Sequence, residues 1–277
     1  MEYICGDKYT DKISTYQFFP KKYYNKFIKN YINNENLIYS LENDNSDLLI
    51  FITKIESLEE FYSKILLFIK KKFIIITHYG DKNGGCFNKI INHPMLIKWY
   101  GINMKISNKT SAIPIGLESI HYGRTNFDII KINENNNKDK LLYLNFSLKT
   151  HRNRKNIMNI LLKKGFKQNE KKKWEDYIED LSKHKFCISP RGRGVDCHRH
   201  WECLYLGVIP IIEKSPEMKD FADLPILYVD NYHKINVKYL NQIYEEFQKK
   251  TFNMEKLNLM YWNNKIKGHF KDSFYTN

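Results

Sequence analysis

The predicted fold rests on one stretch of the sequence, residues 185–212. It reads KFCISPRGRGVDCHRHWECLYLGVIPII. An apolar run stops at Pro190 and opens into a basic loop that contains Gly192 and Gly194. The next residues place apolar side chains at the i, i+3, i+4 and i+7 spacing of a buried helix face, and Gly207 ends this pattern. A second short apolar run follows. The order strand, loop, helix, strand predicts a βαβ unit with its loop at the carboxyl end of the first strand.

This unit has the features of an anion site. In open α/β sheets, ligands bind at the carboxyl ends of the strands, and the free N–H groups at a helix amino terminus attract negative charge. Glycines let the backbone approach a ligand, and Arg191, Arg193 and Arg199 offer forked donors to phosphate oxygens. We therefore expect the unit to bind a nucleotide diphosphate.

The same residues resemble a known family. Residues 186–192, then Arg199 and Glu202, then residues 207–212 resemble the carboxyl-terminal signature of the exostosin-like glycosyltransferases. That signature is an apolar strand ending in Cys-hydrophobic-x-Pro-x-Gly, an Arg-x-x-Glu helix and a Gly-x-hydrophobic-Pro strand. The resemblance implies an α/β fold of two facing Rossmann-like lobes with parallel sheets, called GT-B, in which the carboxyl-terminal lobe binds a nucleotide diphosphate sugar.

The resemblance also implies donor-binding residues. A predicted strand at 141–146 leads to a helix at 156–164, and arginines at this position of the pattern contact the donor diphosphate. The predicted donor site comprises Arg152, Arg154, Arg191, Gly192, Gly194, Arg199 and Glu202. We expect Arg199 to contact the diphosphate and Glu202 to accept hydrogen bonds from the ribose. The alternative for this pair is a helix-surface ion pair, worth only about 0.2–0.5 kcal/mol.

The amino-terminal half predicts a second Rossmann-like lobe. Residues 46–53 and 73–77 read as buried parallel strands joined by a helix at 57–72, and residues 17–39 read as a preceding helix. By the crevice rule, His78 and Asp81 follow the second strand at the cleft, where a transferase needs a general base for the acceptor hydroxyl. The alternative is that His78 caps local backbone and Asp81 closes a turn.

Glu118 is the third candidate for the base. Residues 93–103 and 112–118 resemble the amino-terminal lobe of small exostosin-like enzymes, with a Pro-x-Gly turn at the cleft edge just before Glu118. The aspartate-histidine-aromatic motif of larger exostosins is absent from the sequence, so no base is carried over by motif. The predicted catalytic residues are therefore His78, Asp81 and Glu118.

The lobe boundary is predicted within the polar, asparagine-rich segment 131–140. This gives an acceptor-side lobe at 1–133 and a nucleotide-sugar-binding lobe at 134–277, with a terminal helix within 257–270 that crosses back to the first lobe. A chain of 277 residues is long enough for two such lobes.

Charge and cysteine content narrow the partners and the compartment. The formal charge of +14 favours anionic partners, although AT-rich coding bias explains many lysines, and the lysine runs 70–72 and 171–173 read as solvated helix ends. Five cysteines without paired spacing indicate reduced thiols. Neither a signal peptide nor an integral membrane segment is apparent, so we expect a cytoplasmic protein, unlike many exostosin-like enzymes.

The combined interpretation is an inverting, metal-independent glycosyltransferase. It needs no cofactor, and it moves a sugar to a hydroxyl of a glycan or glycoprotein acceptor. Positive side chains and a helix terminus neutralise the leaving diphosphate, and no Asp-x-Asp motif is present to hold a metal. Nucleic acid is not an expected partner.

Three alternatives stay open. A zinc site would use Cys187, Cys197, His198, His200 and Cys203. It lacks a CxxC pair, and the two histidines diverge by about 200° on a helix. A nucleic-acid binder would use the loop 190–194 and leaves Glu202 unexplained, because a carboxylate repels phosphates. A sugar-binding protein without catalytic activity is the third.

Overall fold

The computed structural model describes residues 1–19, 34–80, 87–122 and 125–269. The chain folds into two compact units. The amino-terminal unit comprises Ile4–Ile115 with Leu259–Asn277, and the carboxyl-terminal unit comprises Met1–Tyr3 with Gly116–Asn258. Each unit contains its own all-parallel sheet, which confirms the predicted α/β class with two Rossmann-like lobes.

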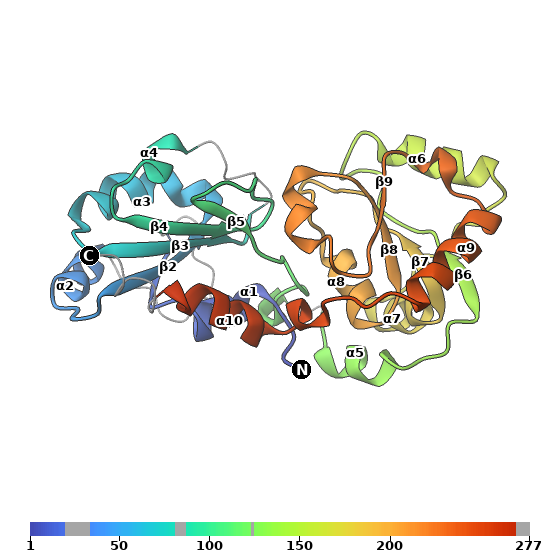
Figure 1. Cartoon of the computed structure of the whole chain (residues 1–277), viewed down its shortest axis with the longest axis horizontal. Helices are drawn as coiled ribbons and strands as arrows, with labels where there is room; N and C mark the ends of the chain where they lie inside the picture. The colour runs from blue at the N-terminus through green and yellow to red at the C-terminus, as the bar shows by residue number, and fades with distance from the viewer. Residues whose placement is uncertain (20–33, 81–86, 123–124, 270–277) are drawn as a thin grey trace. The chain divides into compact units, whose positions relative to one another are not determined.

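The sheet of the amino-terminal unit has five parallel strands in sequential order. They are β1 (Tyr16–Phe18), β2 (Leu48–Lys54), β3 (Lys72–His78), β4 (Leu96–Gly101) and β5 (Thr110–Ala112). Isoleucine-rich β2 and β3 are buried along most of their lengths, as expected of strands covered on both faces. One face packs against α2 (Asn34–Glu42), α3 (Leu58–Lys64) and α4 (Asn88–Ile91). Figure 1 draws α1 (Gly6–Lys12) and α10 (Leu259–Lys267) on the other side.

Two sequence predictions fail in this unit. The predicted helix at 17–39 is wrong at its start, because Tyr16–Phe18 forms β1 and pairs with β2 from Tyr16↔Phe51 to Phe18↔Thr53. Local periodicity cannot report this pairing, which joins residues far apart in sequence. The predicted helix at 57–72 is also too long, since α3 ends at Lys64 and a 3-10 turn, Leu66–Phe68, leads into β3.

The carboxyl-terminal unit has a four-stranded parallel sheet, again in sequential order. Its strands are β6 (Lys140–Tyr143), β7 (His184–Ile188), β8 (Ile209–Glu213) and β9 (Leu227–Val229). Alternate strand residues form a core with α6 (Arg154–Lys163) and α9 (Val237–Gln248) on one face. On the other face, α7 (Trp174–Ser182) brings the ring of Tyr177 within 5.7 Å of Tyr143 in β6, and α8 (His198–Tyr205) connects β7 to β8.

The boundary between the two units lies at Ile115/Gly116, before the boundary of 133/134 that the sequence predicted. Residues 116–133, with α5 (Phe127–Asn133), belong to the carboxyl-terminal unit. Residues Met1–Tyr3 belong to the same unit, and the ring centroid of Tyr3 lies 5.5 Å from that of Phe127 and 4.9 Å from that of Tyr205 in α8. At the other end of the chain, α10 belongs to the amino-terminal unit. No described helix is both long and apolar enough to cross a membrane.

Candidate functional site

The loop after β7 is held by one arginine. The guanidinium of Arg154, at the start of α6, donates to three backbone carbonyls: Pro190 at 2.7 Å, Arg191 at 2.9 Å and Ser147 at 3.0 Å. Arg154 is buried, its guanidinium lies 5.6 Å from the Phe146 ring, and burial lowers its pKa. This side chain therefore fixes the path of the loop 190–197 between β7 and α8.

The first turn of α8 is fixed from within the unit. The indole of Trp201 donates to Asp196 Oδ1 at 2.8 Å, and His200 lies between Asp196 Oδ1 at 3.3 Å and the Ser189 carbonyl at 3.0 Å. All three side chains are buried. At the other end, Gly207 has φ +66, the left-handed conformation that favours glycine after a helix, as the sequence predicted.

A cavity of about 1010 Å³ lies at the carboxyl ends of β6 and β7. We call it the larger cavity. Its ionisable lining includes five cationic side chains and three carboxylates. The cations are Arg154, Lys171, Lys172, Lys173 and Arg199, and the carboxylates are Glu118, Glu175 and Glu202. The excess of positive charge suits an anionic ligand. The lysine run 171–173 is exposed, as predicted, and it also borders this cavity.

Arg199 and Glu202 are joined through a third residue of the larger cavity. Arg199 Nε donates to the Tyr177 hydroxyl at 3.2 Å, and that hydroxyl donates to Glu202 Oε2 at 2.7 Å. The indole of Trp174 donates to the other oxygen, Oε1, at 3.3 Å, and Arg199 Nη1 also donates to the Asn145 carbonyl. The pair is therefore not a surface ion pair but part of a network between α7 and α8.

Neighbouring groups and burial set the protonation states of the side chains in this network. Burial opposes the charge on Arg199, but Tyr177, Cys187 and Glu202 raise its pKa above the usual value. Burial also raises the pKa of Tyr177 well above normal, so its hydroxyl stays protonated and can donate to Glu202. Glu202 itself is only 8% exposed. The sequence pattern placed both residues correctly on one helix face and missed Trp174 and Tyr177, which come from another helix.

The three candidate bases lie in different parts of the chain. Glu118 belongs to the carboxyl-terminal unit and lines the larger cavity. His78 lies in the amino-terminal unit, buried at the end of β3, where its Nδ1 accepts a hydrogen bond from the Tyr79 backbone N–H at 2.9 Å. Asp81 falls outside the described residues. The catalytic assignment of these residues stays a prediction.

The larger cavity also contains a histidine that the sequence pattern did not single out as part of a donor or acceptor site. His198, the first residue of α8, lines it, and its Nδ1 lies 2.8 Å from the Gly116 carbonyl. Gly116, the glycine of the Pro-x-Gly sequence, has φ +69, so a side chain at this position would be strained. Glu118 and His198 both line the larger cavity.

The other predicted donor residues lie around the loop. Gly192 is buried, and a Cβ there would meet the guanidinium of Arg154 at 3.4 Å, so glycine permits close packing against that anchor. Gly194 is buried, whereas Arg152 is exposed, and neither lines the larger cavity or the pocket next to Arg191. Arg191 lines a separate pocket. Whether these residues bind a donor stays a prediction.

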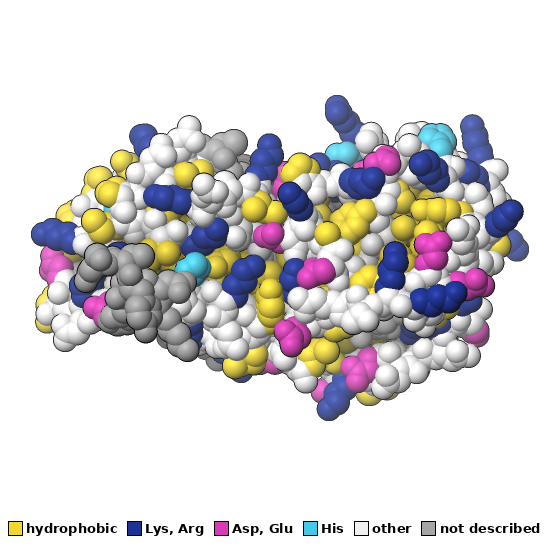
Figure 2. All heavy atoms as spheres, in the orientation of Figure 1, with side chains coloured by type: hydrophobic (Ala, Val, Ile, Leu, Met, Phe, Trp, Pro, Cys, Tyr) yellow, Lys and Arg dark blue, Asp and Glu magenta, His cyan; other side chains and the backbone are white. Residues whose placement is uncertain are grey.

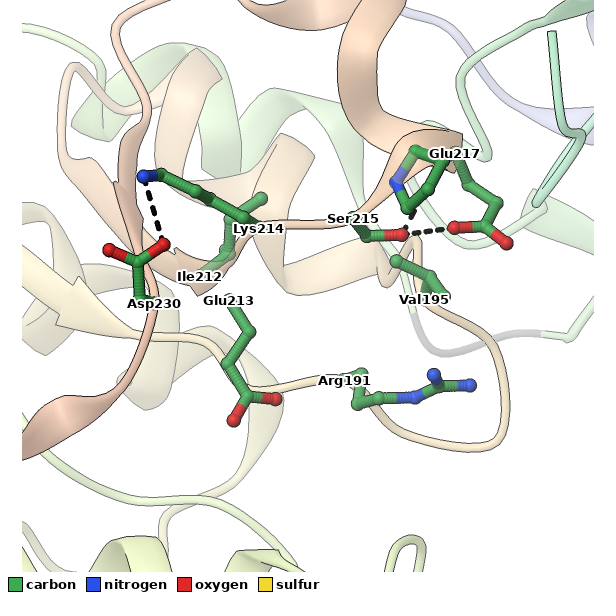
Figure 3. A pocket seen from close by; sticks show the side chains of 9 residues that line it. Arg191, Val195, Ile212, Glu213, Lys214, Ser215, Glu217 and Asp230 are labelled. Carbon is green, nitrogen blue, oxygen red and sulfur yellow. Dashed lines mark hydrogen bonds and ion pairs between the residues drawn. The ribbon is translucent and has the colours of Figure 1, made fainter.

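That separate pocket, which we call the smaller pocket, has a volume of about 350 Å³ at the carboxyl ends of β8 and β9 (Figure 3). Two cations and three carboxylates line it: Arg191 and Lys214, with Glu213, Glu217 and Asp230. Consecutive loop residues, Pro190 and Arg191, line the larger cavity and the smaller pocket respectively. The loop 190–197 therefore borders both.

Surface charge does not gather into one basic stripe on the face drawn in Figure 2. Lys and Arg side chains are spread there among acidic and uncharged ones. Within the described ranges, no three His, Cys, Asp or Glu side chains are grouped so as to hold a metal ion.

The chain therefore has two Rossmann-like α/β units with all-parallel sheets, and one of them has a cationic cavity at the carboxyl ends of its strands. Residues 122–277 match the family model described as the RXYLT1 C-terminal domain. The match spans more than half of the chain, so the protein belongs to this family, which is a glycosyltransferase family. The matching family model does not name the exostosin-like family that the sequence resembles. It does confirm the predicted glycosyltransferase class. No curated protein matches the chain.

Proposed function

We propose that the protein transfers a pentose, xylose, from a nucleotide diphosphate sugar to a hydroxyl of a glycan or glycoprotein. The family match supports a xylosyltransferase, and the larger cavity supports an anionic donor. The observation that carries the proposal is the placement of Arg199, Glu202 and the lysine run 171–173 around one cavity at the carboxyl ends of β6 and β7. All of these residues lie within the family match.

In this mechanism the protein neutralises the leaving diphosphate with side chains. The loop 190–197 and the amino terminus of α8 receive the phosphates, and Arg199 adds a forked donor. Charge that develops on the leaving group is then stabilised by groups already in place, so a divalent ion is not required. For an inverting reaction, a base removes the proton of the acceptor hydroxyl as that oxygen bonds to the anomeric carbon and the diphosphate leaves. Glu118 is the candidate that lines the larger cavity.

A thermal-shift panel of UDP, GDP, CMP and their sugar conjugates tests the donor class. A ligand that binds only the native state stabilises it by about 2.7 kcal/mol at 100 times its dissociation constant, which gives a clear shift in Tm. We expect a shift with one nucleoside diphosphate and its sugar conjugate, unchanged by EDTA. No shift across the panel, together with a shift on adding RNA or DNA, would instead support a nucleic-acid-binding protein.

An activity assay then tests the base. Glu118→Gln should lower turnover by about 100-fold while donor affinity stays at the parent value, because general-base loss affects the chemical step. His78→Ala and Asp81→Asn are the matching variants for the other two candidates. If none of the three lowers turnover, the base lies elsewhere or the reaction retains configuration.

A further inference from the structure

The smaller pocket differs from the larger cavity in the sign of its lining. Three carboxylates and two cations surround about 350 Å³, whereas cations predominate in the larger cavity. An isolated phosphate would meet the carboxylates, and an isolated cation would meet Arg191 and Lys214. A neutral molecule rich in hydroxyls can donate hydrogen bonds to carboxylates and accept them from a guanidinium at the same time. The lining therefore favours a sugar.

Only part of this lining is already paired. Lys214 Nζ forms an ion pair with Asp230 Oδ1 at 2.9 Å, and the Ser215 hydroxyl donates to Glu217, as the dashed lines in Figure 3 show. Two groups remain. Arg191 Nε is buried and has no hydrogen-bond partner among the described residues. The Glu213 carboxylate is partly buried and makes neither a hydrogen bond nor an ion pair within the described part of the chain.

The buried Arg191 Nε calls for an explanation, because nearly all buried polar groups in proteins have partners. The Glu213 carboxylate is only partly buried and so stays accessible to a ligand. Figure 3 shows Glu213, from the end of β8, and Arg191, from the loop after β7, bordering the same space without a bond between them. Burial raises the pKa of Glu213, while Arg191 opposes the shift. A ligand with hydroxyl groups would satisfy both side chains.

The position of the loop 190–197 indicates which ligand this is. Its residue Pro190 borders the larger cavity and its residue Arg191 borders the smaller pocket. A donor with its nucleoside in the larger cavity would have its diphosphate at the loop and its sugar beyond it. We propose that the smaller pocket holds the transferred sugar of the donor, with Glu213 accepting hydrogen bonds from its hydroxyls and Arg191 donating to them. This inference rests on the proposed function.

Specificity follows from the same charges. A sugar that carries its own carboxylate would face Glu213, Glu217 and Asp230, so the pocket selects neutral sugars over uronic acids. Neither Glu213 nor Arg191 is expected to contact the nucleoside, since neither lines the larger cavity. Binding of the sugar and binding of the nucleotide are therefore separable.

Titration calorimetry with UDP, UDP-xylose and UDP-glucuronate tests the inference, or the corresponding guanosine compounds if the thermal-shift panel favours GDP. In Glu213→Gln, we expect affinity for UDP-xylose to fall about 10-fold or more through loss of a charge-assisted hydrogen bond, with affinity for UDP unchanged. The preference of the parent protein for UDP-xylose over UDP-glucuronate should also narrow. Glu179→Gln, at an exposed glutamate of α7, is the matched control and should bind all three ligands like the parent.

The measurements distinguish failure of the proposed function from failure of the sugar subsite. If the parent protein binds no nucleotide, the proposed function fails and this inference fails with it. If the parent binds UDP-xylose and Glu213→Gln binds it equally well, the sugar subsite is wrong while the donor cavity stands. A fall in affinity for UDP equal to that for UDP-xylose also overturns the subsite, because Glu213 would then act on the nucleotide or on the whole unit.

Discussion

The larger cavity and the smaller pocket use their polar side chains in opposite ways. In the larger cavity, Arg199, Tyr177 and Glu202 bond to one another, and Arg154 bonds to three carbonyls. In the smaller pocket, Arg191 Nε and the Glu213 carboxylate have no such partners in the described chain. Bonded groups stabilise the fold and hold their positions before a ligand arrives. Unbonded groups cost stability and are available to a ligand.

The largest effect that this comparison predicts is on Arg154. Arg154→Met should lower the free energy of unfolding by at least about 3 kcal/mol, because three charge-assisted hydrogen bonds to the carbonyls of Ser147, Pro190 and Arg191 are lost together. Urea denaturation of the purified variants measures this. Arg152→Ala, at the exposed neighbour, should change stability by less than about 0.5 kcal/mol. Equal effects of the two substitutions would show that Arg154 does not anchor the loop.

The second prediction concerns the network of the larger cavity. Arg199→Ala and Glu202→Ala should each weaken donor affinity by about 1.5–3 kcal/mol, roughly 10- to 150-fold. The same substitutions should also affect stability, because Glu202 is buried and bonded to Trp174 and Tyr177. Each variant should also lose about 1–3 kcal/mol of unfolding free energy, which urea denaturation measures separately.

Calorimetry at a temperature where the variants are folded separates the two effects. Glu179→Gln again serves as the control, because its carboxylate is exposed on α7 and pairs only with Lys183 at 2.7 Å among the described residues. If the folded Arg199→Ala and Glu202→Ala variants bind the donor as tightly as the parent protein, the network has only a structural role.

Sequence reasoning succeeded where the signal is local. Isoleucine-rich runs mark β2 and β3, and the pattern from Pro190 to Gly207 places α8 and its end within a residue or two. It failed where the determining contact is distant. Tyr16–Phe18 pairs with β2, and the partners of Glu202 come from α7, which precedes β7 in the chain. Periodicity shows which residues share a helix face but not what that face meets.

Glu213 illustrates a signal that was present and not used. It is the last residue of β8, directly after the apolar run that ends at Ile212, so the crevice rule applied to His78 applies equally to it. That rule identifies the edge of the sheet at which ligands bind. It does not tell whether a side chain there is already paired, and this distinction requires the positions of Lys214, Ser215 and Asp230.

The smallest predicted effect is a gain in stability, and it tests the comparison most directly. Because burial raises the pKa of Glu213, with Arg191 opposing, the folded protein binds its proton more tightly than the unfolded chain does. Stability attributable to this group is therefore present below the unfolded pKa, about 4.3, and is lost as pH rises through the folded pKa. At neutral pH the ionised carboxylate costs stability without a ligand. Because Glu213 is only partly buried, water screens part of this cost, so Glu213→Gln should raise the free energy of unfolding by at most about 1 kcal/mol at pH 7.

The gain should vanish as the pH falls below about 4, where Glu213 is protonated in both the folded and the unfolded state. Urea denaturation of the parent and the variant at pH 7 and at about pH 3 measures it. The control has the opposite sign, since the hydrogen bond and charge of Lys183 lower the pKa of Glu179, so Glu179→Gln should not stabilise the protein at either pH. If Glu213→Gln destabilises the protein at pH 7, the Glu213 carboxylate contributes to the fold like those of the larger cavity, and the contrast between the two sides of the loop disappears.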